Sequence, residues 1–177
     1  MKKIIFTLTA IIYTLNAFCQ ITQEGVGSVE FPEPASKITK EQLREHIAAK
    51  FDNDQVFMKN LSLRKPEHEY IIKDVLVDIN FAKIGPGQKV DINQKKREND
   101  FVFINDKTYK SEIRDIYGNQ VLIISRLASG NIESYSFFLY NKEGTKVIVG
   151  MLDFHRNNKE VAKSVLEHIL THAKFKD

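Results

Sequence analysis

The last third of this chain contains four candidate strands, three of which have apolar residues at consecutive positions. Successive side chains of a strand point to opposite faces of the sheet, so consecutive apolar residues indicate a sheet that is covered on both faces. Short turns rich in glycine and asparagine separate the candidates, which favours an antiparallel meander. The predicted strands are Asp100–Lys110, Gln120–Leu127, Ile132–Asn141 and Thr145–His155.

Two amphipathic helices are predicted to cover this sheet. Asn157 is the expected N-cap of a C-terminal helix with a broad apolar stripe. Thr39 and Gln42 have the spacing of a capping box before a first helix over residues 40–51. With one helix on each face, the sequence predicts an α+β fold, a three-layer α/β/α sandwich around a mainly antiparallel sheet. The alternative is a dimer that buries one face of the sheet. The expected apolar stripe comprises Val161, Val165, Leu166, Ile169, Leu170 and Ala173.

The region between the first helix and the meander is predicted to be mostly extended. Gln55–Leu63 and Tyr70–Ile84 are rich in β-branched and aromatic residues. The segment Gln88–Asp100, which contains the run Lys95–Lys96–Arg97, has the composition of a solvated loop or a mobile flap. A short strand is expected at Ser28–Phe31.

The N-terminus has the features of a cleavable export signal. Lys2 and Lys3 precede a short, mostly apolar run, and Ala17 and Cys19 place small side chains at positions −3 and −1 of a cut before Gln20. The run is shorter than the roughly 20 residues that a membrane-spanning helix needs. We therefore expect a signal peptide over residues 1–19, a single α/β domain over residues 20–177, no transmembrane segment, and a periplasmic or secreted protein. Lipid anchoring at Cys19 is the less favoured alternative, because the bulky Phe18 precedes the cysteine.

Cleavage would remove the only cysteine, so the exported chain would lack disulfides, thiol nucleophiles and cysteine-ligated metal sites. The whole chain has 26 Lys and Arg against 23 Asp and Glu, and without Lys2 and Lys3 the balance becomes 24 against 23. Such a balance gives no general attraction to nucleic acid or to anionic lipid. No cofactor-binding motif is present, and none is expected.

The strongest candidate site residues are at the end of the last predicted strand. Asp153 and His155 are two positions apart and therefore share a face, with Arg126 and Arg156 expected nearby. A carboxylate beside an imidazole can orient a general base. The structural alternative is that this pair marks the point where the strand leaves the core. The four residues are predicted to form a binding site rather than a catalytic one.

His168 and His172 form a weaker candidate pair. They are four residues apart on the C-terminal helix, a spacing that allows two imidazoles to share a metal ion. The acidic residue of a metalloprotease motif is absent, because Ile169 follows His168. Solvated histidines near a helix C-terminus are the alternative interpretation.

The final unit of the chain resembles the end of PsbP-like α/β/α sandwich proteins. The resemblance lies in Tyr140–Gly144, in Val147–Leu152 followed by Phe154, and in the helix over residues 158–173 that leads to Phe175. The segment Ser28–Pro32 agrees with the first strand of that family, although this chain has no tryptophan after it. The resemblance implies a fold that serves non-enzymatic binding and assembly, and no functional residue is carried over from it.

These observations favour a non-catalytic exported binding or accessory protein whose partner is another envelope protein. An immunity protein that neutralises a periplasmic toxin is a second hypothesis, since such proteins are small, exported and without chemistry of their own. The third is a small hydrolase or metal-dependent enzyme that uses Asp153 and His155, or His168 and His172. The sequence leaves the oligomeric state, monomer or dimer, open.

Overall fold

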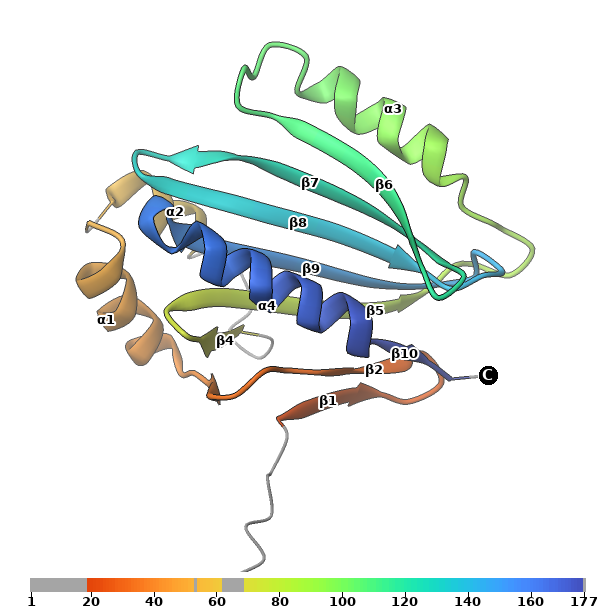
Figure 1. The fold of residues 1–177 in the computed structure, drawn as a ribbon, viewed down its shortest axis with the longest axis horizontal. Helices are drawn as coiled ribbons and strands as arrows, with labels where there is room; N and C mark the ends of the chain where they lie inside the picture. Colours follow the sequence, from red (N-terminus) through yellow and green to blue (C-terminus); the bar gives the residue numbers. More distant parts are fainter. Residues whose placement is uncertain (1–18, 53, 62–68, 177) are drawn as a thin grey trace, which may run out of the picture.

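A seven-stranded antiparallel sheet forms the centre of the molecule (Figure 1). The computed structural model describes residues 19–176 except residues 53 and 62–68, so the expected signal peptide lies outside the described residues apart from Cys19. Neighbouring strands pair in antiparallel register throughout, as the meander pattern predicted. In spatial order the strands are β3 (Ala35–Lys37), β4 (Glu69–Ile72), β5 (Val75–Lys83), β9 (Lys146–His155), β8 (Ile132–Tyr140), β7 (Asn119–Ser129) and β6 (Lys110–Ile116).

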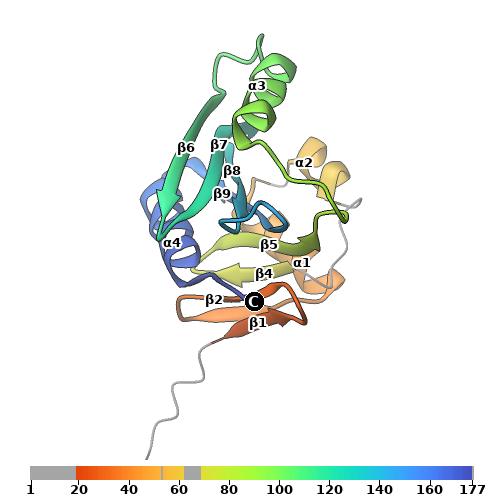
Figure 2. The same cartoon turned by 90° about the vertical axis from the view of Figure 1, so that its right-hand side faces the viewer.

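Helix α4 (Lys159–His172) packs on one face of this sheet (Figures 1 and 2). Its buried residues recur with the three- and four-residue spacing of one helix face and contact the buried face of the central strands. Val161 was expected in this stripe but is 36% exposed, and Ala162 takes its place. The buried residues of α4 are Ala162, Val165, Leu166, Ile169 and Leu170.

Three helices occupy the opposite face: α1 (Lys40–Lys50), α2 (Gln55–Leu61) and α3 (Ile92–Val102). The predicted capping box of α1 is confirmed, because Gln42 N donates to Thr39 Oγ1 at 3.3 Å and Thr39 N donates to Gln42 Oε1 at 2.9 Å. Helices α1 and α2 contribute to an apolar cluster around Leu76 and Ile132, and Ile92 of α3 packs with Leu122 and Ile124. The three-layer arrangement is therefore present, although α1 covers only one end of its face.

Helix α3 corrects the expectation of a solvated loop over Gln88–Asp100 and of a strand over Asp100–Lys110. Asp91 caps the helix by accepting from Asn93 N at 2.8 Å, and Lys96 pairs with Asp100 at 2.6 Å, four residues further on. The charge run is thus part of a helix, in which ion pairs between residues three and four apart connect successive turns. Strand pairing begins only at Lys110.

Helix α2 corrects the expectation of extended structure over Gln55–Leu63 as far as Leu61, and the last two residues of that range lie outside the described residues. The Asp54 carboxylate accepts from Phe57 N at 2.9 Å, as an N-cap does. The Ser129 hydroxyl donates to the same carboxylate at 2.7 Å, and these hydrogen bonds lower the pKa of Asp54. A cap of this kind stabilises a helix that β-branched residues alone would not predict.

A small antiparallel sheet closes the molecule beside α4. It consists of β1 (Gln20–Gln23), β2 (Gly27–Glu30) and β10 (Lys174–Phe175), with β2 in the middle. The expected strand at Ser28–Phe31 corresponds to β2. Both ends of the described chain therefore meet on the same side of the large sheet (Figure 1).

Within the part of the chain that the structure describes, none of the helices combines the length and the apolar character that crossing a bilayer requires.

Candidate functional site

A hollow of about 420 Å³ lies where the end of β7, the start of β8 and the start of α4 meet. The segment before β6 forms its remaining wall. Side chains from four separate parts of the sequence therefore surround one space. The lining residues are Lys107, Thr108, Lys110, Ser125, Arg126, Leu127, Glu133, Arg156 and Lys159.

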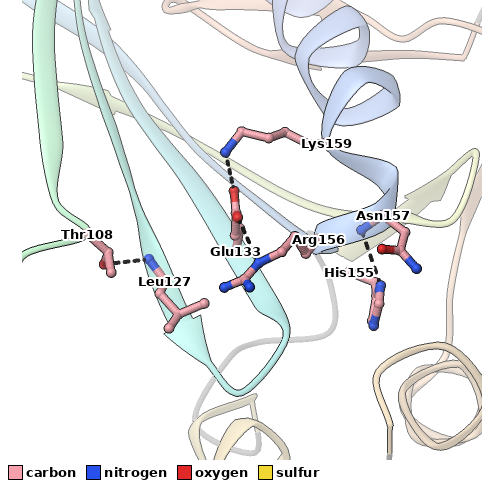
Figure 3. Close-up of polar contacts among 7 residues, drawn as sticks. All are labelled: Thr108, Leu127, Glu133, His155, Arg156, Asn157 and Lys159. Carbon is pink, nitrogen blue, oxygen red and sulfur yellow. Dashed lines mark hydrogen bonds and ion pairs between the residues drawn. The ribbon is translucent and has the colours of Figure 1, made fainter.

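The hollow has a strong excess of positive charge, since five cationic side chains surround it and Glu133 is its single carboxylate. Glu133 accepts from Lys159 Nζ at 2.6 Å and from Arg156 Nε at 3.3 Å (Figure 3). The hydrogen bond from Lys159 to Glu133 raises the pKa of the lysine, which keeps it protonated. Among the described residues, no carboxylate lies within 4.0 Å of the Lys107 or Lys110 ammonium group. An anion that enters the hollow would meet lysines whose charge has not been neutralised.

Thr108 attaches the lysine-bearing segment to the sheet. Leu127 N donates to Thr108 Oγ1 at 2.9 Å (Figure 3), and the Thr108 hydroxyl donates to Asp106 at 2.7 Å. The hydrogen bonds that Thr108 donates from its hydroxyl and, at 2.8 Å, from its backbone N–H lower the pKa of Asp106. Lys107, next to Thr108 in the chain, is held at the edge of the hollow by this attachment.

A second hollow of about 400 Å³ adjoins the first and shares Lys110 and Ser125 with it. It lies between α4 and the edge strand β6, and its apolar lining comes from Ile123, Tyr135 and Leu166. Arg114 of β6 donates to Glu167 of α4 at 2.7 Å and so joins the two elements. We call the two hollows together the β6–α4 groove, which has a cationic end and a more apolar end.

Two of the four predicted site residues line the cationic end of this groove. Arg156 contacts Glu133 there, and Arg126 lines the hollow with its guanidinium over the ring of Phe103, 5.1 Å from the ring centroid. An aromatic face favours a cation at this distance. The structure therefore brings Arg126 and Arg156 together at this hollow.

Asp153 and His155 have separate partners. Asp153 is fully buried, and its carboxylate accepts a hydrogen bond from Ser134. His155 Nε2 lies 3.3 Å from Asp52, and its Nδ1 accepts from Asn157 N at 3.3 Å. With the imidazole engaged at both nitrogens, this arrangement anchors the β9–α4 connection to the α1–α2 linker. Asn157, the expected N-cap, lies in a short 3₁₀ turn (Arg156–Asn158) that precedes α4.

His168 and His172 face each other near the C-terminal end of α4. Their rings are stacked, with centroids 4.0 Å apart and planes inclined by 10°. Burial and the neighbouring His172 lower the pKa of His168, which favours its neutral form.

The sequence reasoning did not identify Lys107, Lys110 or Lys159 as site residues. Lys107 and Lys110 belong to one segment at the start of β6, whereas Lys159 begins α4, and only the order of strands in the sheet brings the two segments together. The charge of each lysine was visible in the sequence, but no spacing rule connected the three.

Comparisons with known proteins identify a fold-level resemblance and no family. No protein-family model matches the chain, and no curated protein matches it. Among solved structures, the chain is similar to the cyanobacterial PsbP protein, CyanoP, from Synechocystis sp. PCC 6803. The two share 9% sequence identity over 89% of this chain and 91% of the other, with a TM-score of 0.49. The PsbP-like resemblance noted in the sequence is thus present in the structure as a weak likeness of fold.

Proposed function

We propose that this protein is a non-catalytic accessory protein of the cell envelope that binds an acidic segment of another envelope protein in the β6–α4 groove. The observation that carries the proposal is the excess of five cationic side chains over one carboxylate around the hollow at the start of α4. Two of these cations, Lys107 and Lys110, are not offset by any carboxylate of the described chain within ion-pair distance.

The dual character of the groove favours a peptide over a small inorganic anion. Its cationic end suits aspartate or glutamate side chains, and its adjoining end offers the apolar surfaces of Ile123, Tyr135 and Leu166. A peptide can place a carboxylate and an aliphatic side chain a few residues apart, which a single phosphate or sulfate ion cannot do. An acidic segment with interspersed leucines is therefore the best chemical match.

The charge of the rest of the chain favours a local and selective attraction. Without Lys2 and Lys3 the chain has nearly equal numbers of basic and acidic residues, so its surface lacks a general positive field. The cationic end of the β6–α4 groove therefore differs in charge from the rest of the chain. The export signal expected at residues 1–19 supports a partner outside the cytoplasm.

A binding measurement with a defined peptide tests this proposal. The probe is a fluorescein-labelled peptide of alternating glutamate and leucine, titrated with protein at low salt and followed by fluorescence anisotropy. We expect saturable binding that is at least tenfold weaker for the double variant Lys107→Glu and Lys110→Glu. The matched control is Lys89→Glu with Lys142→Glu, which makes the same charge change at two exposed positions near the β8–β9 turn, at the opposite end of the sheet.

Comparison of the two double variants shows whether binding depends on the groove. If both double variants weaken binding equally, the attraction is a general effect of net charge and the groove is not the site. If a single-stranded oligonucleotide of equal charge binds more tightly than the peptide, the proposed class of partner is wrong. In the native host, a photo-crosslinking residue at position 110 is expected to capture an exported protein, and the same residue at position 142 is not.

A further inference from the structure

Glu30, His168 and His172 bring three potential metal ligands together at the contact between β2 and α4. One ligand atom from each residue lies within 4.8 Å of the other two. Glu30 is the last residue of β2, and the two histidines are one turn apart on α4. The geometry points to a zinc site in which this carboxylate and these two imidazoles bind one ion. The inference does not depend on the β6–α4 groove, whose lining includes α4 residues from Lys159 to Glu167 and neither of the two histidines.

The chemistry of the donor set suits zinc. Zn²⁺ is commonly bound by imidazole nitrogens and carboxylate oxygens at about 2.0–2.2 Å, and three protein ligands leave one coordination position for water. Ligand atoms within 4.8 Å of one another can converge on a common ion once the two stacked imidazoles rotate out of their parallel arrangement, so that their lone pairs meet at the ion. The Glu30 carboxylate would also offset part of the charge of the ion.

The hydrogen bonding of His172 fixes the tautomer that this role requires. Its Nδ1 lies 2.9 Å from the carbonyl oxygen of His168. A carbonyl only accepts, so Nδ1 carries the hydrogen and the lone pair is on Nε2. Hydrogen bonds of this type fix the tautomer and the ring orientation of metal-binding histidines in many proteins.

His168 offers an independent observation. Its Nε2 atom is buried and has no hydrogen-bond partner among the described residues. A buried nitrogen without a partner costs free energy, and a metal ion would satisfy it. The site would also connect the small sheet to the C-terminal end of α4, since Glu30 and the two histidines belong to different layers.

A zinc ion bound at this site would stabilise the folded protein. A ligand that binds only the folded state raises its stability in proportion to the logarithm of ligand concentration over Kd. The melting temperature of the protein is therefore expected to increase with zinc concentration, which gives a readout that needs no enzymatic or binding activity.

Isothermal titration of the untagged protein with Zn²⁺, after treatment with a chelator, tests the inference. We expect one ion per chain and a melting temperature several degrees higher with zinc. Glu30→Gln and His172→Ala are each expected to weaken binding at least tenfold. The control is His155→Gln, which removes a histidine that contacts Asp52 and should leave zinc binding unchanged.

Circular dichroism in the presence of chelator separates a lost ligand from a lost fold, because Glu30→Gln and His172→Ala are expected to retain the spectrum of the parent protein. Substitution with Co²⁺ gives a second readout, since four-coordinate cobalt has more intense visible absorption than the hydrated ion. Absence of one-site binding, or binding that survives both substitutions, would overturn the assignment.

Discussion

Gly150 of β9 lies directly opposite Phe137 of β8, and the Phe137 ring fills the space above the glycine. A Cβ atom at Gly150 would lie 2.1 Å from Phe137 Cε1 and 2.8 Å from Ile79 Cδ1. Phe137 is fully buried in the cluster beneath α4. Glycine usually weakens the interior of a strand. At position 150 it is required, because the Phe137 ring occupies the space that a side chain would need.

Gly150→Ala is expected to lower the free energy of unfolding by about 2–3 kcal/mol, because the new methyl group forces a fully packed ring to move. Urea denaturation measures the change. The control is Gly85→Ala, where the nearest atom is the flexible end of Gln88 at 3.1 Å and little change is expected. Phe137→Leu should recover part of the stability lost in Gly150→Ala. If the two alanine variants have equal stability, the packing explanation is wrong.

Asp100 is predicted to connect α3 to the sheet in a pH-dependent way. Its carboxylate accepts from Lys96, from Ser111 and, at 2.8 Å, from Tyr109, and the hydrogen bond from Lys96 contributes most to lowering the pKa of Asp100. A carboxyl group with a lowered pKa in the folded state stabilises the fold above its unfolded pKa of about 3.9, and this contribution is lost as pH falls through the folded value.

Asp100→Asn should therefore reduce stability by about 1 kcal/mol at neutral pH, a modest value because the carboxylate is partly exposed. The difference from the parent protein should disappear toward pH 2. Denaturation at a series of pH values measures this, and carbon-detected NMR follows the carboxyl directly. Ser111→Ala should move the pKa of Asp100 back toward its usual value, and an unchanged titration would contradict the assigned contact.

Glu133 is expected to limit the affinity of the β6–α4 groove for anions. It accepts from Arg156 and Lys159 at the cationic end of the groove. Glu133→Gln removes the only carboxylate of that hollow, so the acidic peptide described above should bind about threefold to tenfold more tightly. Glu143→Gln, in the β8–β9 turn, is the control with the same charge change. Equal effects of the two substitutions would show that the position of the charge is unimportant.

Much of the large sheet could be predicted from consecutive apolar residues. Val121 and Ile123 pack with the cluster under α4, whereas Leu122 and Ile124 pack with Ile92 of α3, so both faces are covered as the sequence indicated. Helix α3 was missed because only Ile92 is buried along its length. A helix stabilised by a cap and by surface ion pairs has the composition of a loop, and only the spacing of Lys96 and Asp100 could have distinguished the two.

The candidate sites were predictable to a smaller extent. Helical periodicity alone placed His168 beside His172, but Glu30 joins them through the packing of β2 on α4. The β6–α4 groove was also only partly predictable. Arg156 is close to α4 in the sequence, whereas Lys107 is brought to the groove by the order of β6, β7 and β8 in the sheet. Contacts between distant segments depend on how the strands and helices are arranged, and short sequence patterns do not specify that arrangement.

The pairing of β2 with β10 has a consequence for the order of folding events. Gly27 lies against the carbonyl of Lys174, close enough that a Cβ atom at residue 27 would be 2.4 Å from that oxygen. The hairpin of β1 and β2 therefore lacks its third strand until residue 174 has left the ribosome. Until then one edge of β2 has no partner strand, so completion of the small sheet is a late step in the folding of this chain.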